Sequence, residues 1–408
     1  MKCRFCNHEL TYPFIDLVNS PPSNSFLRFE ELNKPEIFFP LKLYVCDTCF
    51  LVQIDEYKRS EEIFSDTYAY FSSFSRSWLT HAKEYAGMIA ARLRLTDQSF
   101  VVELASNDGY LLQYFKEKNI PCLGIEPAKS VADVARKKDI DVLTEFFGVR
   151  LAQQLEQEGK MADLMIGNNV LAHVPDINDF VQGVKILLKT NGVATFEFPH
   201  LMRLKEENQF DTIYHEHFSY FSFYSVERIF SKHGLVLFDV EELPTHGGSL
   251  RIYAGHSEDR SKRISPQTQL LRDKEVAAGI NNLKYYHDFQ NRANYVKHQM
   301  LSFLLSCHRE GKKVAAYGAA AKGNTLLNYC GIKKDLIAFV VDASPHKQGK
   351  FLPGSHIPVV SENEIKKRRP DYILILPWNI KEEIIEQLEY VRKWNGKFFT
   401  AIPGLTIY

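Results

Sequence analysis

The stretch TIYHEHFSYFS, residues 212–222, gathers side chains that carry protons or bind metal ions. Tyr214, His215, Glu216 and His217 follow one another, and Tyr220 comes shortly after them. On a strand, His215 and His217 would share one face and supply two metal ligands, with Glu216 on the other face. The same groups could form a catalytic acid–base cluster, because imidazole titrates near neutral pH. A polar patch of satisfied interior groups is the third interpretation, and the rest of the chain must decide among them.

Two CxxC pairs near the N-terminus offer a more complete set of metal ligands. They consist of Cys3 with Cys6 and Cys46 with Cys49. Four thiolates suit a tetrahedral zinc ion, and a closed set of four leaves no position for a catalytic water. The separation between the pairs is longer than is usual, so four unrelated cysteines remain the alternative. We expect a structural zinc site here and assign no role to the other three cysteines.

The segment VVELASNDGY, residues 101–110, is predicted to be a strand, a turn of small residues and the start of a helix. It lacks the glycines of GxGxxG, which allow a backbone to approach a pyrophosphate. Its acidic residues Glu103 and Asp108 would repel a phosphate. They suit instead the cationic, phosphate-free cofactor S-adenosylmethionine (SAM), with Ser106 and Gly109 in the turn around it.

Further cofactor-binding candidates follow the next strands. Glu126 ends CLGIEP, where a carboxylate can accept hydrogen bonds from both ribose hydroxyls, although a helix-capping role is equally open. Asn168 and Asn169 end ADLMIGNNV, at the edge where open α/β sheets bind ligands. Phe146 could flank an adenine or pack into the core.

These candidates require a parallel sheet that brings the carboxyl ends of its strands together. From residue 99 to residue 199, strand-like segments alternate with helical patterns, which predicts a parallel sheet covered by helices on both faces. Residues 266–310 have the periodicity of one long helix, and a shorter α/β alternation follows it. The first 60 residues lack helical periodicity and indicate a small, loop-rich module.

We therefore predict an α/β protein with a central Rossmann-like SAM methyltransferase domain between two others. The expected boundaries are a zinc-binding domain at 1–70, a SAM-binding domain at 71–262, and a second Rossmann-like α/β domain with linking helices at 263–408. Three domains are reasonable for 408 residues.

The charge balance and the lack of long apolar stretches bear on which classes of partner the protein can have. Fifty basic residues balance fifty acidic ones, and no long basic run indicates nucleic-acid binding. The sequence contains no apolar stretch of membrane-spanning length and begins without the apolar core of a signal peptide, so we expect a cytoplasmic protein without a membrane partner.

Long motifs along the whole chain resemble the SAM-dependent sugar C-methyltransferases, which act on nucleotide-linked 4-keto deoxysugars. The resemblance is carried by the double CxxC, ELASNDGYLL, NNVLAHVPD, YHEHFSYFS, HGGSLR, YGAAAKGNTLLNYCGI, VVDASPHKQGKFLPGSHIPV and ILPWN. It implies the same three domains, the last of which helps to hold the nucleotide sugar. It also implies methylation at C3 of a 4-keto-6-deoxyhexose carried on a nucleoside diphosphate, usually dTDP.

Within this resemblance, the second histidine of YHEH is the catalytic base, which corresponds to His217, with Tyr214 and Glu216 as its neighbours. Tyr68 in SDTYAYFSS and His173 in NNVLAHVPD correspond to further catalytic residues. The late AKGNT segment matches residues 321–325 and includes Asn324 as a substrate-binding candidate.

This chemistry explains the residue types. A proton on C3 beside a C4 ketone can be removed because the charge passes into an enolate, so the site needs a base near C3 and a donor near O4. His217 can supply the base, Glu216 could orient it, and Tyr214, Tyr68 and His173 are candidate donors.

The substrate diphosphate requires cations or backbone donors. Arg251 in HGGSLR and Lys322 at a small-residue turn that opens a helix are the candidates. For Lys322 the alternative is an ordinary solvated lysine.

Two other functions remain open. One is an O- or N-methyltransferase on the same fold, and the other is a non-catalytic zinc-containing binding module. We expect a monomer, because one chain supplies all three domains around one site.

Overall fold

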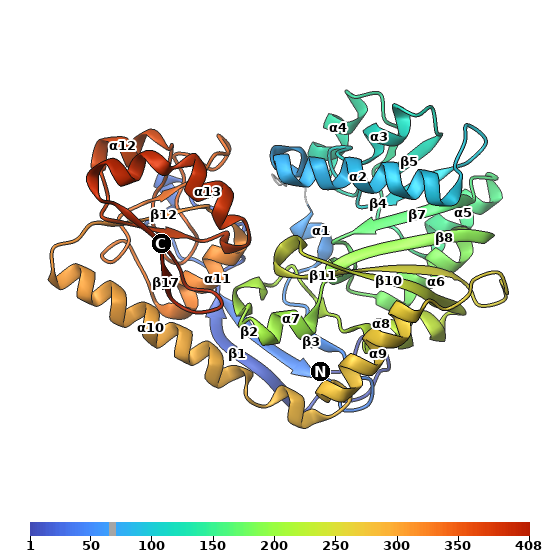
Figure 1. The fold of residues 1–408 in the computed structure, drawn as a ribbon, viewed down its shortest axis with the longest axis horizontal. Coiled ribbons are helices and arrows are strands. Elements are labelled where there is room, and N and C mark those ends of the chain that lie inside the picture. The colour runs from blue at the N-terminus through green and yellow to red at the C-terminus, as the bar shows by residue number, and fades with distance from the viewer. Residues whose placement is uncertain (65–70) are drawn as a thin grey trace.

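The computed structural model describes residues 1–64 and 71–408, and the predicted catalytic Tyr68 lies outside these described residues. The described chain forms three sheets. In Figure 1 the helices and strands of the central domain form one lobe together with helix α9 (Pro266–Ala278), the later elements of the C-terminal domain form the other, and the N-terminal strands β1 and β2 run between them. The predicted α/β fold class is confirmed.

The N-terminal sheet is more regular than the predicted loop-rich module. Its strands are β1 (Tyr12–Ser20), β2 (Phe39–Val45), β3 (Val52–Ile54) and β9 (Ser219–Tyr220). They lie in the order β1-β2-β3-β9 and pair antiparallel. Along β2, Leu41, Leu43 and Val45 are buried while the residues between them are more exposed, as expected for a strand with one covered face. The fourth strand comes from the middle of the chain, so the N-terminal sheet is completed by the YHEHFSYFS stretch.

The central sheet has the order β10-β11-β8-β7-β4-β5-β6. Its strands are β4 (Val101–Leu104), β5 (Cys122–Ile125), β6 (Val142–Leu143), β7 (Ala162–Asn168), β8 (Leu188–Pro199), β10 (Leu235–Leu243) and β11 (Ser249–His256). The strands from β6 to β8 pair parallel, and β11 and β10 add antiparallel to β8. The carboxyl ends of β4, β5 and β7 therefore meet at one edge, as the positions of the cofactor candidates require.

Helices cover both faces of this sheet. The helices and short helical turns of the first two domains are α1 (Ser60–Ile63), α2 (Arg76–Leu93), α3 (Leu112–Lys116), α4 (Lys129–Arg136), α5 (Val149–Gln157), α6 (Ile177–Leu187), α7 (Leu201–Glu206), α8 (Phe223–Lys232), η1 (Phe29–Glu31), η2 (Ser72–Phe74), η3 (Leu171–His173), η4 (Phe210–Thr212) and η5 (Thr245–Gly247). Val101 packs with α2, α3 and α4, while its neighbour Val102 packs with α5, α6 and α8. Successive residues of a strand point to opposite faces, so an almost uninterrupted apolar strand fits this double cover.

The C-terminal domain contains a second sheet with parallel core strands. Its elements are β12 (Val314–Tyr317), β13 (Val340–Val341), β14 (Val359–Val360), β15 (Tyr372–Ile375), β16 (Lys397–Thr400), β17 (Thr406–Ile407), α11 (Ala321–Cys330), α12 (Asn363–Arg368), α13 (Lys381–Gln387), η7 (Trp378–Ile380) and η8 (Glu389–Trp394). The order β14-β13-β12-β15-β16-β17 reverses direction beside β12, as in doubly wound nucleotide-binding sheets. The loop from β12 to α11 opens at this switch point.

The single long helix predicted for residues 266–310 is wrong. The segment contains α9 (Pro266–Ala278), the short turn η6 (Leu283–Tyr286) and α10 (Phe289–Arg309). Gly279 ends α9 in a left-handed conformation with φ of 89°, which glycine adopts without steric cost. Apolar spacing continues through this break because both helices bury a face, and the spacing alone did not reveal it.

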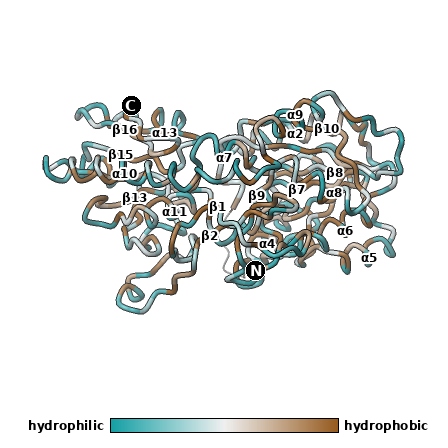
Figure 2. Tube along the Cα trace, turned by 90° about the horizontal axis from the view of Figure 1, so that it is seen from below, coloured by the Kyte–Doolittle hydropathy of each residue, from teal (hydrophilic) through white to brown (hydrophobic). Residues whose placement is uncertain are grey.

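Segments from all three domains cross their boundaries. β1 packs against α10 and α11 of the C-terminal domain, and the view from below also places β1 and β2 between the two lobes (Figure 2). Thr325 Oγ1 donates to the Ile213 carbonyl at 2.7 Å, and Asn324 Nδ2 donates to the Ser23 carbonyl at 2.6 Å. The boundaries at residues 70 and 262 stay predictions, because the packing does not divide cleanly there.

None of the helices in the described part of the chain combines the length and apolar character that crossing a bilayer requires.

Candidate active site

The YHEH stretch lies in a turn between η4 and β9, and not on a strand. The predicted alternative of a two-histidine metal face is therefore wrong. His215 Nε2 lies 3.2 Å from the Pro40 carbonyl, and its ring packs against Phe39 and Tyr57. His215 thus anchors the turn to the N-terminal sheet, which leaves His217 to face the other way.

His217 is held as a neutral imidazole whose Nε2 is a hydrogen-bond acceptor. Its Nδ1 lies 3.0 Å from the Thr212 carbonyl, which can only accept, so Nδ1 carries the proton. The Tyr214 hydroxyl then donates to Nε2 at 2.8 Å. Burial lowers the pKa of His217 well below its usual value, and the neighbouring His173 ring acts in the same direction. This is the arrangement of a general base.

His173 packs beside His217, with ring centroids 4.7 Å apart. Its Nδ1 donates to the Glu216 carbonyl at 2.8 Å, so Nε2 of the neutral ring is an acceptor. Burial lowers the pKa of His173 to about 4. The expectation that His173 is a donor to an enolate oxygen therefore requires correction, because at neutral pH this ring presents no proton at Nε2.

Glu216 does not orient His217 as expected. Its Oε1 accepts from Asn24 Nδ2 at 2.7 Å, and the side chain is buried. Burial raises the pKa of Glu216, and the bond from Asn24 opposes this rise. The backbone carbonyl of Thr212 holds the imidazole instead, a contact that residue types alone cannot reveal.

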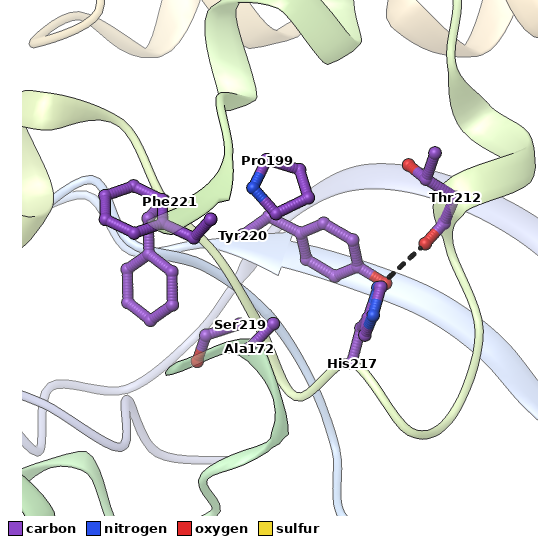
Figure 3. Close-up of a pocket in the computed structure, with 8 residues that line it drawn as sticks. Ala172, Pro199, Thr212, His217, Ser219, Tyr220 and Phe221 are labelled. Carbon is purple, nitrogen blue, oxygen red and sulfur yellow. Dashed lines mark hydrogen bonds between the residues drawn. The ribbon is translucent and has the colours of Figure 1, made fainter. Parts of the chain in front are cut away.

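A small pocket opens beside the base. It is lined by Ala172, Phe198, Pro199, Thr212, His217, Ser219, Tyr220 and Phe221. Figure 3 shows the rings of Tyr220 and Pro199 above His217 and the bond from His217 to Thr212. Apart from the imidazole the walls are mostly apolar, which favours a neutral base over a charged one.

His246, in the HGGSLR motif, is a residue of this site that the sequence analysis missed. Asn169 Nδ2 donates to His246 Nε2 at 3.0 Å. Burial lowers the pKa of His246 to about 4, and Lys322 acts in the same direction. The signal available in the sequence was a histidine directly before two glycines. In the structure His246 has a positive φ of 54°, a conformation that non-glycine residues rarely adopt.

Lys322 reaches the site from the start of α11. Its Nζ lies 3.2 Å from Asn379 Oδ1 and 4.9 Å from the centre of the Trp378 ring. Trp378 in turn donates from Nε1 to Asp211 Oδ2 at 2.7 Å. Burial lowers the pKa of Lys322, and Asp211 counteracts this shift. The lysine is thus buried in the C-terminal domain's contact with the central domain, and not solvated as the alternative interpretation had it.

The edge expected to bind SAM is built by a turn after β4. Asn107 has a φ of 49° and Gly109 a φ of 74°. A Cβ on Gly109 would lie 2.5 Å from Ile140 Cδ1, so glycine lets the turn pack this closely against Ile140, between α4 and β6. Asn107 Oδ1 accepts from the Ser72 backbone at 2.9 Å, and Asp108 Oδ2 accepts from Ser73 at 3.2 Å.

Buried polar atoms without partners gather at this edge. Among the described residues, no hydrogen-bond partner is found for both Glu103 carboxylate oxygens, Ser106 Oγ, Asp108 Oδ1, Asn168 Nδ2 and Asn169 Oδ1. Leaving such groups unsatisfied is costly. A nucleoside with an amino-acid tail carries the donors and acceptors that would satisfy them, so the donor set fits SAM.

The two carboxylates of this edge differ in environment. Glu103 is fully buried, and burial raises its pKa well above the usual value although the adjacent Tyr110 opposes the shift. Glu126 accepts from the backbone of Asn107 at 3.0 Å and of Ala128 at 2.8 Å. Burial raises the pKa of Glu126 to about 7, against these two bonds. The helix-capping alternative for Glu126 is not borne out, because both bonds come from residues outside α4, which begins at Lys129 without a side-chain cap.

The remaining candidates are less closely grouped. Phe146 is 42% exposed, whereas Phe147 packs edge-on against Phe180. Asn324 is buried and donates to Ser23, with no partner for its Oδ1 among the described residues.

Arg251 is not the free cation that the sequence analysis expected. Its two terminal nitrogens donate to Glu197 and to Glu241, each at 2.8 Å, and only 4% of the residue is exposed. Both partners sit directly opposite it on neighbouring strands. Because these carboxylates already neutralise the guanidinium, the pairing argues against a diphosphate contact.

The four cysteines of the CxxC pairs form the expected cluster. Their sulfur atoms all lie within 4.8 Å of one another, with Cys3 to Cys49 and Cys6 to Cys46 at 3.5 Å. Zinc–thiolate bonds of about 2.3 Å in a tetrahedron need sulfur atoms roughly 3.8 Å apart, so the four thiols fit zinc. Asn178 of α6 and Lys232 of α8 donate to the Phe5 carbonyl, which joins the cluster to the central domain.

Comparisons with known proteins agree with this geometry. Residues 3–64 match a zinc binding domain, residues 78–240 a methyltransferase domain, and residues 244–403 a C-methyltransferase C-terminal domain. The C-methyltransferase NovU of Streptomyces niveus is 33% identical over 402 residues, which cover 98% of this chain and 95% of that protein.

Solved structures of methyltransferases match parts of the chain at lower identity. The magnesium protoporphyrin IX methyltransferase ChlM of Synechocystis is 15% identical with a TM-score of 0.36, and the match covers 48% of this chain and 91% of that one. The methyltransferase CcbJ of Streptomyces caelestis is 13% identical with a TM-score of 0.34, and the match covers 43% of this chain and 89% of that one.

The described geometry and the relative that spans nearly the whole chain lead to the same assignment. The cofactors are SAM and a structural zinc ion, and four cysteines lie close together in the zinc-binding domain. The chain belongs to the SAM-dependent C-methyltransferases that carry an N-terminal zinc-binding domain and a C-terminal α/β domain.

Proposed function

We propose that this C-methyltransferase methylates C3 of a nucleotide-linked 4-keto-6-deoxyhexose, with dTDP as the carrier, in branched deoxysugar biosynthesis. The family resemblance supports the sugar and its carrier. The observation that carries the mechanism is the neutral His217, whose Nδ1 proton is fixed by Thr212 and whose Nε2 lone pair is directed to the Tyr214 hydroxyl.

Proton removal is the first step. His217 Nε2 takes the C3 proton, the C3–H electron pair forms the C3=C4 double bond, and the carbonyl π pair moves to O4. A positioned base of this kind contributes ~10²- to 10⁴-fold. When bound, SAM supplies the electrophilic methyl group that C3 then attacks. His217 leaves this step as imidazolium and returns the proton to solvent.

Donors must stabilise the oxyanion on O4. Tyr214 is the first candidate, because its hydroxyl already lies 2.8 Å from the base. Tyr68 remains a candidate by resemblance. His173 fits a different role, that of a second acceptor beside the base, since its Nε2 carries no proton.

We assign the unsatisfied groups at the sheet edge to SAM. Glu103 and Asp108 face its cationic amino-acid end, and Glu126 accepts from the ribose hydroxyls. Ser106, Gly109, Asn168 and Asn169 line the rest of the cofactor site, with Phe146 beside the adenine. The unpartnered oxygens and amides at this edge support the assignment.

Lys322 and Asn324 are proposed to hold the substrate diphosphate and its nucleotide. Lys322 lies at the first turn of α11, where the helix dipole also favours an anion. A buried lysine with a lowered pKa gains most from an anionic ligand that restores its full charge.

The test is deuterium exchange at C3 of the dTDP-linked 4-keto-6-deoxyhexose in D₂O, followed by NMR with no SAM present. Wild-type enzyme should exchange C3, and His217→Gln should lose exchange and methylation together. His308→Gln, at an exposed position on α10, is the matched control.

The rival functions give different results. An O- or N-methyltransferase would methylate without C3 exchange, and a binding module would show no affinity for S-adenosylhomocysteine in calorimetry. His217→Gln with unchanged exchange and methylation would falsify the proposed base.

A further inference from the structure

The site contains three half-buried histidines, His173, His217 and His246, whose hydrogen bonds fix where each carries its proton. In His217 and His173, Nδ1 donates to a carbonyl, so each ring presents a lone pair at Nε2. In His246 the protein engages the other ring nitrogen, because Asn169 donates to Nε2 at 3.0 Å. The neutral His246 ring must therefore carry its proton on Nδ1.

His246 lies where the cofactor edge, the base and the C-terminal domain meet. Asn169, its partner, follows β7, and His173 comes four residues later in the same connection. On the other side, Gly247 packs against Trp378, over which the Lys322 ammonium lies. After burial, His173 and Lys322 are among the groups that lower the pKa of His217, and His246 is another, so the three rings and the lysine share one electrostatic site.

The backbone around His246 is held on several sides. Thr245 Oγ1 donates to Glu197 Oε1 at 2.8 Å, Gln209 Nε2 donates to the Gly247 carbonyl at 2.6 Å, and the His200 amide donates to the Gly248 carbonyl at 3.0 Å. His246 itself has a φ of 54°. Non-glycine residues rarely adopt that conformation, so the surrounding bonds must enforce it.

Packing also fixes the ring. The Trp78 ring centre lies 5.0 Å from that of His246. With Asn169 at Nε2 and Trp78 beside the ring, the Nδ1–H group is the part of His246 left to address a ligand.

We propose that His246 is a catalytic residue that donates its Nδ1–H hydrogen bond to the oxyanion that develops on O4 of the substrate, while Asn169 fixes the donor tautomer from the cofactor side. The inference rests on the proposed function. His246 then supplies the N–H donor to O4 that His173 does not present at Nε2. The three histidines have three roles, with His217 as the base, His173 as a second acceptor and His246 as the donor.

The His246 side chain can be replaced by groups that separate these roles. In His246→Asn the amide NH₂ falls near the position of Nδ1, and in His246→Asp an acceptor of the same shape takes its place. Asn and Asp both tolerate a positive φ, so backbone strain is matched. In His246→Gln the amide falls near Nε2, which keeps the Asn169 contact and removes the Nδ1 donor.

The expected result is a ranking of C3 exchange rates, measured without SAM in D₂O. His246→Asn should keep exchange within about tenfold of wild type, and His246→Asp and His246→Gln should lose about 10²-fold, the effect of removing one oxyanion donor. Asn169→Asp should lose exchange as well, because a carboxylate at that position accepts and would draw the histidine proton to Nε2. S-adenosylhomocysteine affinity and the melting temperature of the His246 variants should stay close to wild type.

Other outcomes overturn the inference. Equal rates for Asn and Asp, or a Gln variant that behaves as wild type, would show that His246 only supports Asn169. If wild-type enzyme exchanges C3 and His217→Gln abolishes that exchange, the proposed function stands and the donor role alone fails. Absence of C3 exchange in the wild type would remove both.

Discussion

At the scale of residues, the site works through which nitrogen of each imidazole the protein holds, which is Nδ1 in His217 and His173 and Nε2 in His246. His217 lies among groups that all disfavour its protonated form, namely the apolar pocket wall, the His173 ring and the Lys322 ammonium. A base kept neutral in this way is ready at neutral pH without any carboxylate beside it, and this explains why Glu216 is engaged elsewhere.

The pH dependence of the rate follows from this environment. Because burial lowers the pKa of His217 well below its usual value, the acid limb that reports the base should lie well below pH 6.5 in a profile of kcat/KM for the sugar substrate at saturating SAM. Asp211, whose pKa is raised to about 6 by burial, is the other group of the site that titrates near this range. The pH profile should be measured for wild type and for Asp211→Asn, because this variant removes the titration of the Asp211 carboxyl.

A base assignment to His217 would be contradicted by an acid limb at or above pH 6.5 that persists in Asp211→Asn.

Cofactor affinity should rise with pH. Glu126 has a pKa of about 7 in the free protein, and hydroxyl donors from a ribose favour its ionised form, so its pKa falls on binding. Binding therefore releases a proton below pH 7, and affinity decreases by up to about tenfold per pH unit as pH falls below that value. Glu103, with its raised pKa, acts in the same direction.

Calorimetric titration with S-adenosylhomocysteine at pH 6 and pH 8 measures this difference. Glu126→Gln should reduce the pH dependence, while Glu158→Gln, at an exposed position, should keep it. Equal affinity at both pH values in the wild type would argue against Glu126 as the ribose ligand.

The sequence predicted the residue types of the site better than their pairings. The acidic loop was identified from its residue types, and His217 was identified from the family resemblance. Arg251 was misjudged because its partners, Glu197 and Glu241, face it across strands that are distant in sequence. Cross-strand register depends on how β11 inserts between β8 and β10, and no local pattern encodes that.

At the scale of elements, the turn η5, which carries His246, packs directly against Trp378 of the C-terminal domain. A Cβ on Gly247 would lie 2.3 Å from Trp378 Cη2, so the two domains touch here without room for a side chain. Gly247 also has a φ of 89°, a value that it shares with Gly279 at the end of α9.

This pair allows strain to be separated from the domain contact. Gly247→Ala and Gly279→Ala should each lose about 1–2 kcal/mol of unfolding free energy from the positive φ, measured by urea unfolding. Only Gly247→Ala should also displace Trp378, and we expect its kcat to fall more than tenfold while that of Gly279→Ala is unchanged. Equal activities in the two variants would mean that the contact with Trp378 does not position the site.

Element order was predictable where parallel strands alternate with helices, because the apolar strands and amphipathic helices differ in period. The antiparallel strands β10 and β11, the break after α9 and the pairing of β9 were not, since each depends on a partner brought in by the fold.

At the scale of the whole molecule, the zinc cluster supports more than its own module. Arg4, between Cys3 and Cys6, donates to the Pro175 carbonyl at 2.8 Å and to the Ile54 carbonyl at 2.6 Å. The same N-terminal sheet pairs with β9, two residues after His217. Loss of the metal should therefore disturb the position of His217.

We expect zinc removal by a chelator, or Cys49→Ser, to lower the melting temperature by roughly 10 °C or more, since metal binding contributes several kcal/mol to folding. C3 exchange should fall together with zinc content, which atomic absorption measures. Cys122→Ser, outside the cluster, is the control. A zinc-free protein with the melting temperature and exchange rate of the holoenzyme would show that the metal is dispensable.

The pairing of β3 with β9 also limits how this protein can recombine with its relatives. The Ile54 amide donates to the Phe218 carbonyl at 3.1 Å, so residues near the end of the zinc module and residues beside the base must match as neighbours. A chimera that exchanges only the first 64 residues would pair β3 of one parent with β9 of the other. Productive exchange therefore requires that the zinc module and residues 212–222 be inherited from the same parent, although most of the central domain lies between them in the gene.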